Sequence, residues 1–102
     1  MRIITRKRIR QFCREYPATR SSLEGWYAIV KSTSWKSLAD VRRIYPSADA
    51  VLVKSGRTVT VFNIAGNKFR LLAALHYNRG RAYVIDMLTH AEYDRGDWKE
   101  KL

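Results

Sequence analysis

The first part of the chain carries apolar side chains at helical spacing. Residues three and four positions apart form one stripe: Ile9, Phe12, Cys13 and Tyr16. This spacing predicts an amphipathic helix. Thr5 is placed to act as its N-cap, and Pro17 is placed to end it.

The same spacing recurs in a second segment. Its apolar stripe consists of Leu23, Trp26, Tyr27 and Val30, which predicts a second amphipathic helix. A third and less regular set precedes Pro46, and it consists of Trp35, Leu38, Val41 and Tyr45. The weaker pattern fits either a short helix or a packed loop.

From residue 50 onward the pattern changes to runs rich in β-branched and aromatic residues. Four such runs predict strands: 50–53, 58–64, 68–77 and 81–88. Turn-forming residues separate them at 55–56, 65–67 and 78–80, and connections this short favour antiparallel hairpins. Residues 2–4 are expected to add a short edge strand. Thr89 and Glu92 form a capping-box pattern that predicts a short C-terminal helix.

These elements predict an α+β fold, in which two N-terminal helices pack on one face of an antiparallel sheet. Within residues 68–77, alternation places Arg70 and His76 on one face. The opposite face carries only apolar side chains: Phe69, Leu71, Ala73 and Leu75. We expect the apolar face to meet the helices and the face with Arg70 to remain free.

Size and charge narrow the function. A chain of 102 residues predicts one domain over 1–102, without room for a deep cofactor cleft. Its net charge of +11 favours nucleic acid, an anionic membrane surface or an acidic protein as partner. A single cysteine, no secretory signal and no long apolar run predict a cytoplasmic protein. With two histidines and one cysteine, the sequence shows no ligand spacing typical of a metal site, so no metal or cofactor is expected.

The remaining candidate chemistry rests on Lys, Arg, His and Tyr side chains. His90 and Tyr93 are three residues apart and would share one face of a helical turn. Histidine titrates near neutral pH, which suits proton transfer. A set of Lys, Arg, His and Tyr side chains fits metal-independent RNA cleavage, in which the ribose 2′-hydroxyl attacks the adjacent phosphate. An exposed His90 and a packed Tyr93 without a catalytic role would fit the same spacing.

Several other conspicuous residues are expected to be structural. We expect Trp26, Trp35 and Trp98 to anchor the core, and Cys13 to be buried. Arg6, Arg10 and Arg14 lie four residues apart on the first helix. They form either a solvated face or a docking stripe for an acidic partner, and the sequence leaves both readings open.

Two motifs resemble the HigB-type toxins of bacterial toxin–antitoxin pairs. They are NIAGNKFRLLAAL, which starts at Asn63, and RAYVIDMLTHAEYD, which ends at Asp94. The start MRIITRKRIRQFCREYP is also similar to these toxins, so the resemblance spans nearly the whole chain. It implies a RelE-like fold and an mRNA interferase that cuts translated mRNA on the ribosome. It also implies a HigA-type antitoxin with a helix-turn-helix domain, and contact with operator DNA only through that antitoxin.

The resemblance also suggests site residues, matched by position to the two motifs. The expected catalytic residues are Lys68, Arg70, His90 and Tyr93. The expected RNA-binding residues are Asn63, Asn67, Arg57 and Lys99, the last two being basic residues outside the motifs. Lys68 and Arg70 would bind the scissile phosphate, His90 would act as general acid or base, and Tyr93 would orient or stack the nucleotide.

Two positions depart from the pattern of such toxins. Phe69 replaces a common tyrosine, and His76 stands on a strand where an apolar residue is expected. His76 would be either a structural residue or a second titrating group near the site. Two alternatives to the enzyme remain: a nucleic-acid-binding module without catalysis, and a degenerate toxin that serves only as antitoxin partner and co-repressor.

Overall fold

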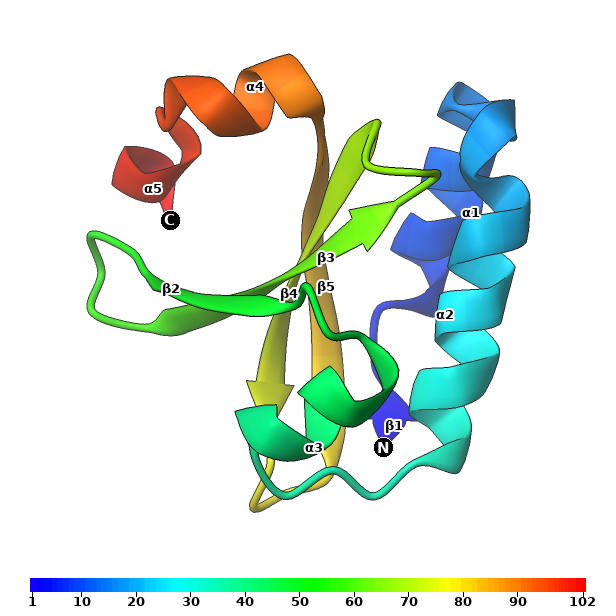
Figure 1. Ribbon diagram of the computed structural model, residues 1–102, viewed down its shortest axis with the longest axis vertical. Coiled ribbons are helices and arrows are strands. Elements are labelled where there is room, and N and C mark those ends of the chain that lie inside the picture. Colours follow the sequence, from blue (N-terminus) through cyan, green and yellow to red (C-terminus); the bar gives the residue numbers. More distant parts are fainter.

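Five strands form one open sheet in the computed structural model, which describes residues 1–102 (Figure 1). The strands are β1 (Arg2–Ile3), β2 (Asp49–Leu52), β3 (Thr58–Ile64), β4 (Phe69–His76) and β5 (Arg81–Thr89). Their order across the sheet is β1-β5-β4-β3-β2. All pairs are antiparallel except β1 and β5, which run parallel. The predicted strands and edge strand are confirmed within one or two residues.

The two N-terminal helices and the helix after Thr89 are present as predicted, and a further short helix, which the sequence did not indicate, ends the fold. The helices are α1 (Arg6–Glu15), α2 (Arg20–Ser32), α3 (Leu38–Ile44), α4 (His90–Arg95) and α5 (Trp98–Lys101). A 3₁₀ turn at Pro17–Thr19 separates α1 from α2. The ambiguous segment before Pro46 is a helix, α3. None of the helices is both long and apolar enough to cross a membrane.

The main core lies between the first two helices and one face of the sheet. The buried stripe residues of α1 and α2 pack there, as does Trp35. From the sheet, Leu71 and Ala73 of β4 face these helices, with the half-buried Phe69 and Leu75 beside them. The α+β prediction and the assigned face of β4 are therefore confirmed. Cys13 and the three tryptophans are buried, as expected.

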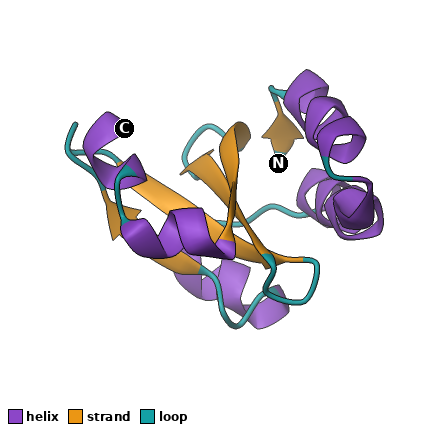
Figure 2. Ribbon diagram, turned by 90° about the horizontal axis from the view of Figure 1, so that it is seen from above, coloured by secondary structure: helices purple, strands orange, loops and turns teal.

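The sequence predicted that the other face of the sheet would be free. This prediction is wrong, because that face is partly covered. A second cluster on this face consists of Val53, Val59, Val61, Leu72, Leu88 and Trp98. Trp98 of α5 supplies the cover, because its indole is only 6% exposed. Seen from above, the N-terminal helices and the C-terminal helices lie on opposite sides of the sheet (Figure 2).

A bulge in β5 ties the start of α1 to the sheet. Leu72 pairs with Asp86 while Ala73 pairs with Val84, so Ile85 is the extra residue. The guanidinium of Arg8 donates a hydrogen bond to the Ile85 carbonyl. Thr5 occupies the N-cap position of α1 but makes no capping bond. Its hydroxyl accepts from the Val84 N–H at 2.5 Å instead, so its predicted capping role is wrong.

The predicted capping box at the start of α4 is confirmed. The Glu92 N–H donates to the Thr89 hydroxyl at 3.2 Å, and the Thr89 N–H donates to the Glu92 carboxylate at 2.9 Å. The pKa of Glu92 is lowered below its ordinary value of 4.5. The hydrogen bond from the Thr89 backbone N–H is the main cause, and the hydrogen bond with the Thr89 hydroxyl is the second. The box fixes where α4 leaves the sheet, and therefore where its side chains point.

Thr89→Ala should lower the free energy of unfolding by about 1 kcal/mol, because one helix N–H loses its acceptor. Thr89→Ser keeps the hydroxyl and should cost less.

The contribution of Glu92 to the free energy of unfolding is complete above the unfolded carboxyl pKa and is lost as pH falls through the lower folded pKa. The penalty of Glu92→Ala should therefore shrink in acid. Urea unfolding at neutral and acidic pH measures both effects, and a pH-independent Glu92→Ala penalty would contradict the capping contact.

Candidate active site

The two motifs meet at one end of the sheet, where the β3–β4 turn lies against the junction of β5 and α4. Phe69 pairs with Thr89 across the two strands, which places Arg70 next to the start of α4. The His90 N–H donates to the Lys68 carbonyl at 3.0 Å. Residues twenty positions apart in sequence are therefore neighbours because β4 and β5 are antiparallel.

Arg70 is the centre of this cluster. Its Nη1 donates to the Asn67 carbonyl at 2.8 Å and to the Phe69 carbonyl at 3.2 Å. Its Nη2 lies 3.0 Å from Nδ1 of His90, and its guanidinium lies 5.5 Å from the centre of the Tyr93 ring. The structure thus brings together Arg70, His90 and Tyr93, three of the four predicted catalytic residues.

His90 is held from both sides of its ring. Nε2 lies 2.9 Å from Oδ2 of Asp94, one helical turn along α4. Arginine can only donate hydrogen bonds, so Nδ1 of His90 must accept from Arg70 and carry no proton. The proton of the neutral ring then resides on Nε2, where it donates to Asp94. This arrangement selects one tautomer of His90.

Asp94 was not among the predicted site residues, although it ends the second motif. The signal that could have identified it is its spacing of four residues from His90 on a predicted helix. The two side chains are 55% and 60% exposed. A hydrogen bond between two side chains this exposed contributes little to stability, so its effect is to orient the imidazole.

Tyr93 connects the cluster to the C-terminal helix. Its ring stacks on Trp98 with centroids 5.3 Å apart and planes 21° apart, and the Trp98 indole N–H donates to the Tyr93 carbonyl at 3.1 Å. The Lys99 ammonium lies 5.8 Å from the Trp98 ring. Burial raises the pKa of Tyr93, and the negative charge of Asp49 raises it further. The phenol is therefore protonated at neutral pH.

The β3–β4 turn explains part of the first motif by backbone geometry alone. Ala65, Gly66 and Asn67 have φ values of 54°, 61° and 73°. Glycine and asparagine tolerate this left-handed region best. The turn presents Lys68 as an exposed side chain beside Arg70. Asn63 pairs with Arg70 across the strands, and its amide donates to the Ser47 hydroxyl at 3.1 Å.

Other residues singled out in the sequence lie away from the cluster. Arg57 precedes β3, six residues and about 20 Å along the chain from Asn63. His76 ends β4 at the opposite end of that strand from Arg70, and its ring contacts Tyr83. The idea that His76 titrates near the site is therefore wrong. Phe69 packs on Tyr16 at 4.9 Å between ring centroids, on the helix side of the sheet.

Asp94→Asn should lower kcat for RNA cleavage by about 10-fold or more and leave KM and stability nearly unchanged. The amide no longer holds the Nε2–H tautomer of His90 by charge, whereas the side chains expected to bind RNA are unchanged. Cleavage rates over a range of RNA concentrations give kcat and KM separately. Asp97→Asn, on the same C-terminal segment but outside the cluster, is the control. A rise in KM alone would show that Asp94 does not position the imidazole.

Comparison with known proteins matches the chain to one family. The family model described as HigB_toxin, RelE-like toxic component of a toxin–antitoxin system, matches residues 19–96. The mRNA interferase HigB of Escherichia coli O6:H1 (strain CFT073) is 27% identical, over 93% of this chain and 90% of that protein. The mRNA interferase toxin HigB of Escherichia coli K12 is 26% identical, over 92% of this chain and 88% of that protein. The resemblance stated from the two motifs is confirmed.

Proposed function

The chain belongs to the HigB toxin family of RelE-like toxins, and we propose that it is an endoribonuclease that cleaves mRNA on the ribosome. One observation carries the proposal for this chain's own residues. It is the contact of His90 with Arg70 at 3.0 Å and with Asp94 at 2.9 Å, on an accessible end of the sheet. A neutral imidazole between a cation and a carboxylate is suited to accept a proton beside a phosphate.

The proposed reaction begins when RNA brings its phosphate to Arg70. The guanidinium turns its Nη2 donor from His90 to a phosphate oxygen, which leaves Nδ1 of His90 free to accept a proton. Nδ1 takes the proton of the ribose 2′-hydroxyl, and the Asp94 carboxylate stabilises the resulting imidazolium through Nε2–H. The 2′ oxygen bonds to phosphorus as the bond to the 5′ oxygen breaks. The 5′ oxygen takes a proton from water, and the proton on His90 neutralises the hydroxide left behind. The products are a 2′,3′-cyclic phosphate and a 5′-hydroxyl.

Lys68 and Arg70 offset the charge that gathers on the phosphoryl oxygens during this step. The side chain of Lys68 is exposed at the turn, where a phosphate can approach it. Tyr93 orients the nucleotide as a neutral phenol, in keeping with its raised pKa. The requirement for a 2′-hydroxyl makes RNA, and not DNA, the substrate.

The remaining predicted residues bind RNA on either side of this centre. Asn63 and Asn67 flank Arg70 in the strand and in the turn. Lys99 extends the cationic surface past Trp98, and Arg57 would contact a more distant part of the RNA. This spread along the sheet fits phosphate contacts, which supply affinity without reading the sequence.

The proposed partner is a HigA-type antitoxin with a helix-turn-helix domain, which would neutralise the toxin and carry it to operator DNA. Membership in a family of toxin–antitoxin components supports a cognate antitoxin. The proposed place of action is the cytoplasm, where translated mRNA is found.

The test is inducible expression in a bacterium, followed by mapping of mRNA 5′ ends. The wild type should arrest growth and create new cuts within translated messages, while His90→Ala should create none. His76→Ala removes the chain's other histidine and should behave as the wild type. Arrest without cuts would favour a binding protein without catalysis. Cuts of equal strength with His90→Ala would overturn the role of His90.

Ribosome dependence is tested with purified protein and one mRNA, with and without ribosomes paused on it. Cleavage that needs the ribosome is the expected result. Equal cleavage of the free message would limit the proposal to a ribosome-independent endoribonuclease.

A further inference from the structure

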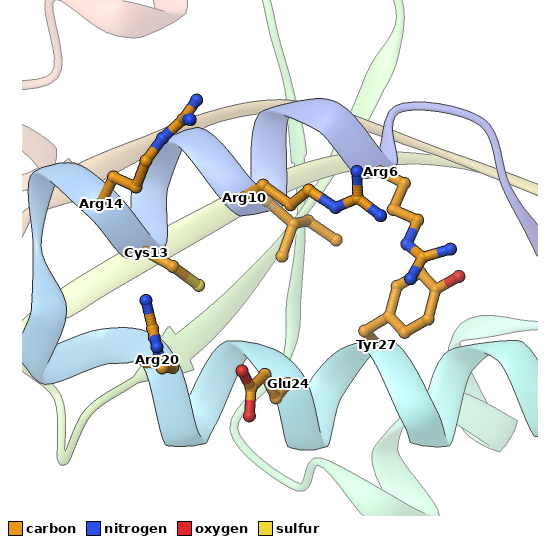
Figure 3. A pocket seen from close by; sticks show the side chains of 8 residues that line it. Arg6, Arg10, Cys13, Arg14, Arg20, Glu24 and Tyr27 are labelled. Carbon is orange, nitrogen blue, oxygen red and sulfur yellow. The ribbon is translucent and has the colours of Figure 1, made fainter.

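A groove between α1 and α2 gathers four arginines around one cavity (Figure 3). The cavity has a volume of about 460 Å³, within the range of ligand pockets. The arginines on its walls are Arg6, Arg10 and Arg14 of α1 and Arg20 at the start of α2. This is the arginine groove, and it shares no residue with the candidate active site.

The four guanidiniums have no acidic partner within the chain. The ion pairs of the protein join other residues, and no side-chain hydrogen bond from these arginines is formed. Of the four, only Arg6 makes a cation–π contact, with its guanidinium 5.2 Å from the centre of the Tyr27 ring. Like charges four residues apart on a helix repel each other. The groove is therefore a concentration of positive charge that lacks its counter-charge.

The floor of the groove is apolar, which distinguishes it from a surface that only binds phosphates. Ile9, Cys13 and Tyr27 lie between the arginines. Glu24 is the one acidic side chain on the wall, and it would repel phosphates and carboxylates alike, so the apolar floor is what separates the two kinds of partner. A peptide can place apolar side chains on such a floor and carboxylates on its rim, whereas a phosphate backbone has nothing to bury there. Arginine is also the cation most enriched at protein interfaces, while lysine is depleted.

The spacing of the arginines matches that of side chains along a second helix. Arg6, Arg10 and Arg14 are each four residues apart, which places them about 6 Å apart along the axis of α1. Carboxylates at the same spacing on a partner helix can meet successive guanidiniums in two-pronged hydrogen bonds.

We propose that the arginine groove binds an acidic helical segment of a partner protein, with carboxylates on the arginines and apolar side chains on the floor. Resting on the proposed function, this assigns the groove to the antitoxin. The groove lies on the N-terminal helices and the candidate active site beside the C-terminal ones, on opposite sides of the sheet (Figure 1). A partner seated in the groove leaves Arg70 and His90 accessible, so the two surfaces can be tested separately.

The probe is a fluorescent helical peptide of about 16 residues, with glutamates at every fourth position and leucines on the adjoining face. Anisotropy at about 150 mM salt compares it with a 2′-O-methyl RNA of the same charge, which cannot be cleaved. The groove variant is Arg10→Glu with Arg14→Glu. The charge-matched control is Lys36→Glu with Arg79→Glu, two exposed residues outside the groove whose side chains make no ion pair. Amide chemical shifts locate the bound peptide.

The groove variant should bind the peptide about 10-fold more weakly or worse, while the control variant stays within about 2-fold of the wild type. Shifted amides should cluster in α1 and α2, and a peptide with serine in place of leucine should bind more weakly. Equal loss in both variants would reduce the result to net charge and overturn the proposal. A groove variant that loses the RNA and keeps the peptide would assign the groove to nucleic acid instead.

Folding and function have separate readouts in this design. Thermal unfolding verifies each variant, and Arg10→Gln with Arg14→Gln replaces the groove variant if charge reversal unfolds it. RNA cleavage is measured on the same samples. A wild type that binds the peptide but cuts no RNA contradicts the proposed function and leaves the groove assignment standing. A wild type that cuts RNA but does not bind the peptide contradicts only the groove assignment.

Discussion

Arg70→Ala should lower the rate of mRNA cleavage by about 100-fold to 1000-fold without unfolding the protein. Arg70 contacts His90 through Nη2 and two backbone carbonyls of the turn through Nη1. Its loss removes both the cation proposed to bind the phosphate and the donor that selects the tautomer of His90. Single-turnover cleavage by the purified variants measures the change.

Two comparisons make this prediction specific. Arg70→Lys keeps the charge but not the planar fork of donors, so it should restore only a small part of the rate. Arg79→Ala removes an exposed arginine from the β4–β5 turn and should cleave as the wild type does. Cleavage by Arg70→Ala within about 3-fold of the wild type would mean that Arg70 is not part of the catalytic centre.

Trp98→Ala should lower the free energy of unfolding by about 3–5 kcal/mol, a large share of the stability of a small domain. Trp98 closes the second hydrophobic cluster and stacks on Tyr93. The variant should also cleave RNA slowly under conditions where it remains folded, because α5 no longer supports Tyr93. Urea unfolding and cleavage in parallel measure the two effects.

Trp98→Phe separates packing from the indole hydrogen bond. It keeps an aromatic ring against Tyr93 but loses the donor to the Tyr93 carbonyl, so its stability should lie between those of Trp98→Ala and the wild type. If Trp98→Ala lowers the free energy of unfolding no more than a substitution of an exposed residue does, α5 does not cover the sheet in solution.

The fold could be predicted from the sequence because apolar residues recur at different spacings in the helices and in the strands of this chain. The stripes around Phe12 and Trp26 identify α1 and α2, and the turn residues separate the three long strands. Thr5 could not be assigned correctly, since its hydroxyl bonds to Val84 of β5, a contact between distant residues. The cover on the second face escaped prediction for a similar reason, because one buried tryptophan on a four-residue helix leaves no periodic signal.

The candidate site could be predicted in part. The motif residues Arg70, His90 and Tyr93 meet because β4 and β5 are adjacent and antiparallel, which the short turn at 78–80 already indicated. Asp94 was missed, although the predicted capping box and the spacing of four residues from His90 were sufficient to place the two side chains on one helix face. In a chain with so many basic residues, the sequence does not indicate which of them lie near the site. Only the pairing of the strands shows that Arg57 lies away from the cluster.

The parallel pairing of β1 with β5 has a consequence for folding kinetics. Residues 2 and 3 find their strand partners at residues 81 and 82, so the sheet closes only through contacts between the two ends of the sequence. Contacts of such long sequence separation slow folding. During synthesis, β1 would remain without its strand partner until β5 has emerged, and the Arg70–His90 pair becomes complete in the same interval. The sequence order therefore delays both the complete sheet and the proposed activity until residues 81–90 have been made.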